Sequence, residues 1–240
     1  NFDIEVGVDP DYEALEMKVG SYINAEGKVV RDAADAVGIV FKMEAIGDDV
    51  PANYPVALQG KTIAGYAVAI ENVVVGRQTL NNEAISSLVT TDATVTNGTQ
   101  ATEALLTGLG DVAFKTTYEK WVNEHLLDGE SLSSWYIPTL NQLGEFMGML
   151  FKVGEVEPTG GQAFREMPEF AFENGVMFDR DPIESVYYAS CTVNGSKDVS
   201  GVIINVDKTT KQVLDAKASS LKVTGSSQKA LCRPMITIFK

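Results

Sequence analysis

The chain contains one histidine, His125, so any catalytic arrangement that depends on an imidazole must use it. His125 lies in "TTYEKWVNEHL", where large side chains recur at three- and four-residue spacing and predict a helix. The sequence has no G-x-S-x-G elbow, phosphate-binding loop or G-x-G-x-x-G motif. We therefore interpret His125 as a partly buried helix residue and not as a general base.

The two cysteines, Cys191 and Cys232, lie in apolar stretches that read as strands, "VYYASCTV" and "ALCRPMITIF". If these strands are neighbours, the thiols could form a disulfide; the alternative is two buried thiols that behave as small apolar side chains. Thiol chemistry is a third use, because the adjacent Arg233 could lower the pKa of Cys232. Two cysteines and one histidine do not complete a four-ligand zinc site.

Acidic residues occur in pairs on predicted loops, for example Asp48 with Asp49. Glycosidase chemistry needs two carboxylates that face each other across about 5–10 Å, and we interpret loop pairs mostly as solvent-facing. Calcium is a better use for such oxygen ligands. The loop "FDRDPIES" carries three acids and is the candidate metal site, which would use Asp179, Asp181 and Glu184. Calcium is the only cofactor that the sequence suggests.

The composition excludes some classes of partner. The chain has 33 acidic and 19 basic residues and a net charge of −14, which disfavours binding to nucleic acid. No stretch has the ~20 apolar residues of a membrane helix. The first residue is Asn1, so we expect a processed or truncated chain that contacts a membrane only through a removed or missing N-terminal anchor.

Strand patterns precede and follow a helical middle. Alternating or β-branched stretches predict strands at 36–43, 62–75, 185–193, 199–207, 211–219 and 233–239, and the last sixty residues read as an antiparallel meander. Helices are predicted near 99–109, at 112–126 and after residue 139. This order predicts an α+β domain over 17–240, after a flexible lead-in at 1–16.

The stretch "WYIPTLNQL" predicts a sharp corner between an extended segment and a helix. Pro138 keeps the preceding residue extended, and Thr139 with Gln142 forms a capping box. The helix then presents one apolar stripe, formed by Leu143, Phe146, Met147 and Leu150. We expect Trp135 and Tyr136 to be buried where the segment meets the helix.

Several motifs, in order, carry a resemblance to a known family: "VGSYINAEGKVV", "AVGIVFKM", "GYAVAIENV", "WYIPTLNQLGEF", "VYYASC" and "LCRPMITIF". From about residue 17 to residue 239 the chain resembles bacterial surface proteins with a domain of unknown function. That domain is related to the C-type-lectin-like and formylglycine-generating-enzyme (sulfatase-modifying factor) fold. Two motifs depart from the family: Asn141-Gln142 replaces a frequent acid, and "YYASC" replaces Tyr-Trp-Ser-Ser.

The resemblance implies a C-type-lectin-like fold, a twisted antiparallel sheet with two or three flanking helices and long loops. It also implies an extracytoplasmic protein of a Gram-negative gut bacterium, either an outer-membrane lipoprotein or a secreted protein. The calcium-and-sugar motif of true C-type lectins is absent, and "EPTG" at 157–160 only echoes it.

We therefore expect a non-enzymatic cell-surface ligand-binding or adhesion module, which recognises a glycan or protein ligand through loops on a rigid scaffold. The candidate ligand-binding residues lie in loops 46–56, 78–100 and 155–182. They are Tyr54, Asn81, Asn82, Phe164, Arg165 and Phe178. The alternatives are an enzyme of the same superfamily, carbohydrate-acting or thiol-based, and a pilus-type structural subunit.

Overall fold

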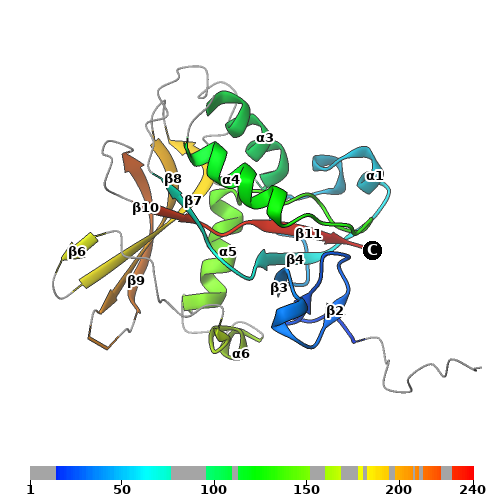
Figure 1. Cartoon of the computed structure of the whole chain (residues 1–240), viewed down its shortest axis with the longest axis horizontal. Coiled ribbons are helices and arrows are strands. Elements are labelled where there is room, and N and C mark those ends of the chain that lie inside the picture. Colours follow the sequence, from blue (N-terminus) through cyan, green and yellow to red (C-terminus); the bar gives the residue numbers. More distant parts are fainter. Residues whose placement is uncertain are drawn as a thin grey trace, which may run out of the picture.

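The computed structural model describes residues 15–76, 96–109, 113–151, 160–168, 178–180, 183–194, 198–207, 209–210, 213–222 and 229–240. The described strands form two sheets (Figure 1). The first has the order β11-β4-β3-β1-β2, with β1 (Tyr22–Ile23), β2 (Val29–Val30), β3 (Gly38–Lys42), β4 (Ile63–Ala69) and β11 (Met235–Phe239). The second has the order β5-β10-β7-β8-β9, with β5 (Val73–Gly76), β7 (Ile183–Asn194), β8 (Asp198–Asp207), β9 (Val213–Lys222) and β10 (Lys229–Cys232); β6 (Phe178–Arg180) also pairs with β7.

The first sheet is antiparallel and buried on both faces at its centre. In β3, Val40 packs into one apolar cluster while Ile39 and Phe41 pack into another on the opposite face. A β-branched and aromatic sequence suits a strand covered on both sides. The predicted strand at 36–43 is therefore confirmed.

The second sheet contains three of the four strands of the predicted meander, because β7, β8 and β9 pair antiparallel in sequence order. The fourth predicted strand was placed wrongly, since β11 pairs with β4 in the first sheet. One pair differs from the expectation of an antiparallel sheet: β10 runs parallel to β7, with Leu231 opposite Tyr188. The predicted strand region at 62–75 contains two strands, since β4 and β5 belong to different sheets and residues 70–72 connect them. In this connection between β4 and β5, the carbonyl oxygen of Ile70 accepts a hydrogen bond of 2.9 Å from the buried Arg233.

The corner predicted at "WYIPTLNQL" is confirmed. The amide of Thr139 donates to Gln142 Oε1 at 3.1 Å, and the amide of Gln142 donates to Thr139 Oγ1 at 3.3 Å. Trp135 is 5% exposed and Tyr136 is fully buried. Tyr136 exchanges two backbone hydrogen bonds with Met235, of 2.9 and 2.8 Å, so the corner is fastened to β11.

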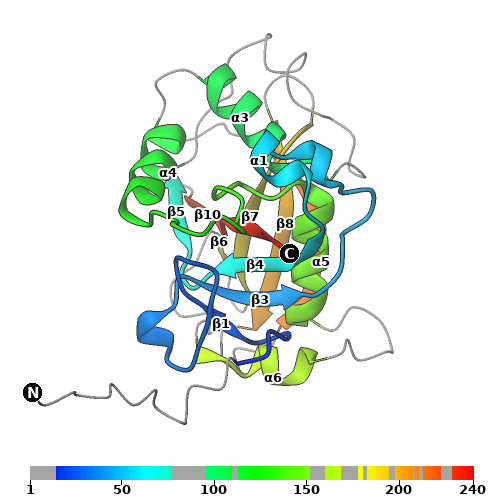
Figure 2. The same cartoon turned by 90° about the vertical axis from the view of Figure 1, so that its right-hand side faces the viewer.

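Helices cover the sheets on two sides (Figure 2). The longer ones are α3 (Gly98–Leu109), α4 (Ala113–Glu124) and α5 (Leu140–Phe151); short helices are α1 (Val56–Gln59), α6 (Gly161–Arg165), η1 (Ala33–Asp35) and η2 (Pro51–Asn53). Residues of α3 and α4 belong to one apolar cluster and residues of α5 to the other. The α+β class is thus confirmed. Within the described ranges, none of the helices is long and apolar enough to cross a membrane.

Candidate functional site

A groove lies between α3, α4 and the extended segment at 134–135, and we call it the α3–α4 groove. Its volume is about 620 Å³. Most of its polar lining residues are neutral, namely Thr99, Thr102, Thr107, Tyr118, Asn123 and Ser134. Trp135 contributes an aromatic side chain to the wall. Such a lining offers hydroxyl and amide groups, which can both donate and accept hydrogen bonds.

Helical spacing explains how these side chains meet. Thr99, Thr102 and Leu106 recur at i, i+3 and i+7 on α3, so they lie on one face. Lys115, Tyr118 and Val122 do the same on α4. Because the two faces oppose each other across the groove, the site depends on the packing of two helices and has no short motif of its own.

Two residues that line this groove, Tyr118 and Thr99, have hydroxyl oxygens (Oη and Oγ1) that are buried and have no hydrogen-bond partner in the described part of the chain. Tyr118 is 2% exposed, and burial holds its pKa well above the ordinary value, so the phenol stays neutral and keeps its proton to donate. Thr102 differs, since its hydroxyl donates to the carbonyl oxygen of Ile137 at 3.0 Å and accepts from the amide of Ile137 at 2.8 Å. Native structures rarely leave such groups unpaired, so these two hydroxyls mark the groove as a candidate binding site.

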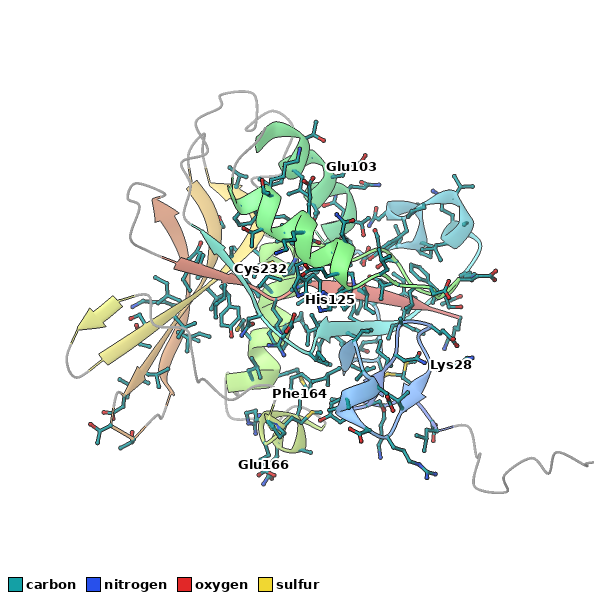
Figure 3. All side chains as sticks on the ribbon, viewed as in Figure 1. Lys28, Glu103, His125, Phe164, Glu166 and Cys232 are labelled. Carbon is teal, nitrogen blue, oxygen red and sulfur yellow. The ribbon has the colours of Figure 1, made fainter. Side chains whose placement is uncertain are left out.

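Carboxylates occur at the rim of the same groove. Glu103 projects from α3 (Figure 3), Glu119 lies on α4, and both are exposed. Glu119 lies 3.8 Å from Lys115 one helical turn away. The rim is therefore slightly acidic, which disfavours an anionic ligand.

The two cysteines lie beneath this region as free thiols with no exposed surface. The Tyr118 phenol lies near both sulfur atoms, because a charge on either thiol would raise the pKa of the phenol. The disulfide alternative is not realised in this structure, because Cys191 and Cys232 are both free thiols.

Neither thiol is activated as a nucleophile. Burial raises the pKa of Cys191 to about 12, although contact with Thr102 opposes the shift. Burial also raises the pKa of Cys232, and nearby Cys191 adds to this shift. The suggestion that Arg233 lowers the pKa of Cys232 is therefore wrong, because desolvation of the thiolate dominates.

His125 follows α4 and is partly buried, as the sequence predicted (Figure 3). Its Nδ1 lies 2.8 Å from the carbonyl oxygen of Trp121, and its Nε2 lies 3.2 Å from Glu71 Oε1. Its ring stacks on Trp121 with centroids 4.2 Å apart. The indole of Trp135 donates to the carbonyl oxygen of His125 at 2.7 Å. His125 therefore supports the wall of the groove, and both ring nitrogens face protein oxygen atoms.

A second polar cluster surrounds Asp49, which sequence reasoning interpreted as a solvent-facing loop acid. Asp49 is only 4% exposed. Its carboxylate accepts hydrogen bonds from Tyr54 Oη at 2.5 Å, Tyr66 Oη at 2.7 Å and Asn53 Nδ2 at 2.9 Å. Burial raises the pKa of Asp49, and these hydrogen bonds oppose the shift. The adjacent Asp48 is exposed, so the paired acids differ in environment.

The Asp49 cluster connects distant parts of the chain. Tyr54 Oη lies 2.7 Å from Thr237 Oγ1, and Tyr136 Oη lies 3.0 Å from the same atom. Tyr54 was predicted to be an exposed ligand contact; this is wrong, since it is buried and its hydroxyl is fully used. The cluster joins the 49–54 loop, β4, β11 and the corner, and no short sequence signal announces it.

The other predicted ligand contacts differ in where the structure places them. Phe164 is fully buried in α6 against Phe146, with ring centroids 6.2 Å apart, so it cannot contact a ligand. Arg165 is partly buried and donates to the carbonyl oxygen of Met149 at 3.1 Å. Asn81 and Asn82 lie outside the described residues.

The predicted metal loop is part of a hairpin. Phe178 and Asp179 lie in β6, and Asp179 is the register partner of Glu184 in β7. Asp181 lies outside the described residues, and the side chains of the others are not described. No group of three acidic, histidine or cysteine side chains that could hold a metal ion occurs in the described ranges. The calcium site stays a prediction.

Comparison of the chain with protein-family models, curated proteins and solved structures finds no significant match, so its function is argued from this geometry.

Proposed function

We propose that this protein is a non-enzymatic binding module and that its ligand occupies the α3–α4 groove. The observation that carries the proposal is the pair of buried hydroxyls, Tyr118 Oη and Thr99 Oγ1, without partners in the described part of the chain. Burying a hydroxyl without a hydrogen bond costs about 1–3 kcal/mol. A ligand that displaces the side chains covering these hydroxyls and supplies partners would offset this cost.

The lining favours a neutral, hydroxyl-rich ligand, which means a glycan more than a protein. Saccharide hydroxyls both donate and accept, as do the threonine, serine and asparagine side chains of the groove. An extended peptide would need backbone partners, usually from a free strand edge, and the walls here are helices. The acidic rim also fits an uncharged ligand better than an anionic one.

The enzyme alternatives find less support. A glycosidase uses one carboxylic acid with a raised pKa in an apolar setting, whereas Glu103 and Glu119 are exposed and Glu119 pairs with Lys115. A thiol-based oxidoreductase needs an accessible thiolate, whereas both cysteines are buried with raised pKa values. Three further parts of the proposal rest on the sequence resemblance alone. They are the C-type-lectin-like character of the fold, adhesion at the cell surface, and the location as an outer-membrane lipoprotein or secreted protein.

The test is a glycan and host-protein array with the purified chain, followed by titration of the strongest ligand against two variants. Thr107 is an exposed lining residue of α3, so Thr107→Trp fills the groove without disturbing the core. Lys120 is exposed on α4 and does not line the groove, so Lys120→Trp is the matched control. We expect Thr107→Trp to weaken glycan binding at least ~10-fold and Lys120→Trp to leave it unchanged. An array without glycan binding, or equal affinities of the two variants, would contradict the proposal; cleavage of the bound glycan would favour the enzyme.

A further inference from the structure

β9 is the outermost strand of the second sheet among the described strands. Its residues Val213–Lys222 pair with Asp198–Val206 of β8, with a register shift at Leu214, and its other edge has no strand neighbour in the described part of the chain. Figure 1 shows this end of the sheet, at the left, extending away from the first sheet and from α1. A strand of ten residues with an unpaired edge is a template for pairing with another chain.

The sequence of β9 is self-complementary about Ala216. Residues 214–218 read Leu-Asp-Ala-Lys-Ala. If two copies pair antiparallel with Ala216 on the two-fold axis, Asp215 of each copy is placed opposite Lys217 of the other. Opposite charges at directly opposed positions stabilise a strand pair, and the symmetry creates this pairing twice.

The regular part of β9 limits how far this pairing extends. The register on β8 shifts at Leu214, because Asp215 is the partner of Asn205 and Val213 is the partner of Val206. The opposed Asp215 and Lys217 lie within the regular part of the strand. These two charge pairs are therefore the contacts that carry the proposal.

We propose that a second copy of this chain binds to the edge of β9 in this register, so that the two β9-containing sheets join into one. The occupant is a second copy because the complementarity is with the same segment. Each copy carries a net charge of −14, so the copies repel each other at long range. At about 0.15 M salt the screening length is about 8 Å. Salt therefore weakens this long-range repulsion more than it weakens the attraction between opposite charges in contact.

If Lys217 instead prevents association, its removal has the opposite effect on dimer formation. Lysines on edge strands often prevent association, because pairing would bury an unpaired charge. If Lys217 has that role, its removal increases association. If Lys217 pairs with Asp215 of a second copy, its removal decreases association.

The experiment is sedimentation velocity of the whole chain at about 0.15 M salt over roughly 10–1,000 μM, because a single strand pair makes a small and weak interface. Lys217→Asp places like charges opposite each other twice, and the double variant Asp215→Lys with Lys217→Asp restores the opposite charges. We expect reversible dimers of the unchanged chain, a dissociation constant at least ~10-fold higher for Lys217→Asp, and recovery to within ~3-fold in the double variant. Far-ultraviolet circular dichroism confirms that each variant is folded, and Lys217→Ala replaces Lys217→Asp if the latter is not.

Three results would overturn the proposal. The first is an unchanged chain that stays monomeric throughout the concentration range. The second is a dimer whose dissociation constant is unaffected by Lys217→Asp or not restored by the charge swap. The third is tighter association of Lys217→Ala, which would identify Lys217 as a residue that prevents pairing.

Discussion

The Asp49 cluster and the α3–α4 groove are both built from polar groups inside the protein, but they differ in how those groups are satisfied. Three side-chain donors converge on the Asp49 carboxylate within 2.9 Å. In the groove, Tyr118 Oη and Thr99 Oγ1 have no partner in the described part of the chain. Polar networks that satisfy themselves stabilise a unique arrangement, whereas unpaired groups lower stability until something binds them. The contrast supports the proposal that the first region has a structural role and the second a binding role.

The largest expected effect is on the Asp49 cluster. Asp49→Ala leaves the hydroxyls of Tyr54 and Tyr66 and the amide of Asn53 without their shared acceptor. We expect the free energy of unfolding to fall by about 3–5 kcal/mol in chemical denaturation. The adjacent Asp48 is exposed and accepts one hydrogen bond from Thr96, so Asp48→Ala should cost less than about 1.5 kcal/mol. Equal losses of unfolding free energy in the two variants would show that the Asp49 cluster does not stabilise the fold more than an exposed acid does.

Two tyrosine variants separate the regions most sharply. Tyr54→Phe removes a hydroxyl that contacts both Asp49 and Thr237, and we expect a loss of about 1–3 kcal/mol. Tyr118→Phe removes a hydroxyl that has no partner among the described residues, so stability should stay within about 0.5 kcal/mol or rise. A loss above about 1 kcal/mol for Tyr118→Phe would mean that its hydroxyl is satisfied in the free protein, and the contrast would fail.

The pH dependence of stability tests the environment of Asp49. Its pKa is raised above 3.8 in the folded chain, so between 3.8 and the raised value the folded state binds more protons than the unfolded state. Stability that Asp49 contributes therefore falls as pH rises through this window. Relative to Asp49→Asn, the unchanged chain should be more stable at about pH 4 than at about pH 7. Denaturation of both at several pH values measures the difference, and the reverse trend would mean that the carboxylate is stabilised as an anion.

The thiols give the smallest expected effect, on reactivity and not on stability. Burial raises the pKa of Cys191 to about 12 and also raises that of Cys232, so both stay protonated near neutral pH. A thiol reagent should react slowly with the folded chain and should label both cysteines once the chain is unfolded. Rapid labelling of the folded chain would reopen the thiol-enzyme alternative.

Sequence reasoning succeeded where the determining residues are neighbours along the chain. The corner was predictable because Pro138, Thr139 and Gln142 act on one another within a few residues. The helices and the meander were predictable from apolar periodicity for the same reason. The division of 62–75 into two strands could not be predicted locally, because Arg233, which donates a hydrogen bond to the carbonyl oxygen of Ile70 at the break, lies 163 residues further along the chain.

The candidate sites were harder to predict, because their partners are distant in sequence. Asp49 is buried by Tyr54 and Tyr66 and is connected to Thr237 through Tyr54. The residues adjacent to Asp49 in the sequence therefore do not predict its burial. Tyr54 and Phe164 were predicted to be exposed because they lie in loop-like sequence, yet both pack into the core. The α3–α4 groove arises from two helices facing each other. The hydroxyls at i and i+3 on the 98–109 helix were the one available signal for it.

The most direct test of the central claim is an amide-resolved NMR titration of the chain with the strongest glycan from the array. If the α3–α4 groove is the binding site, the largest chemical-shift changes lie at residues 99–107, 115–123 and 134–135 and saturate together. Changes centred on the Asp49 cluster, on the β9 edge or on no single region would contradict the account.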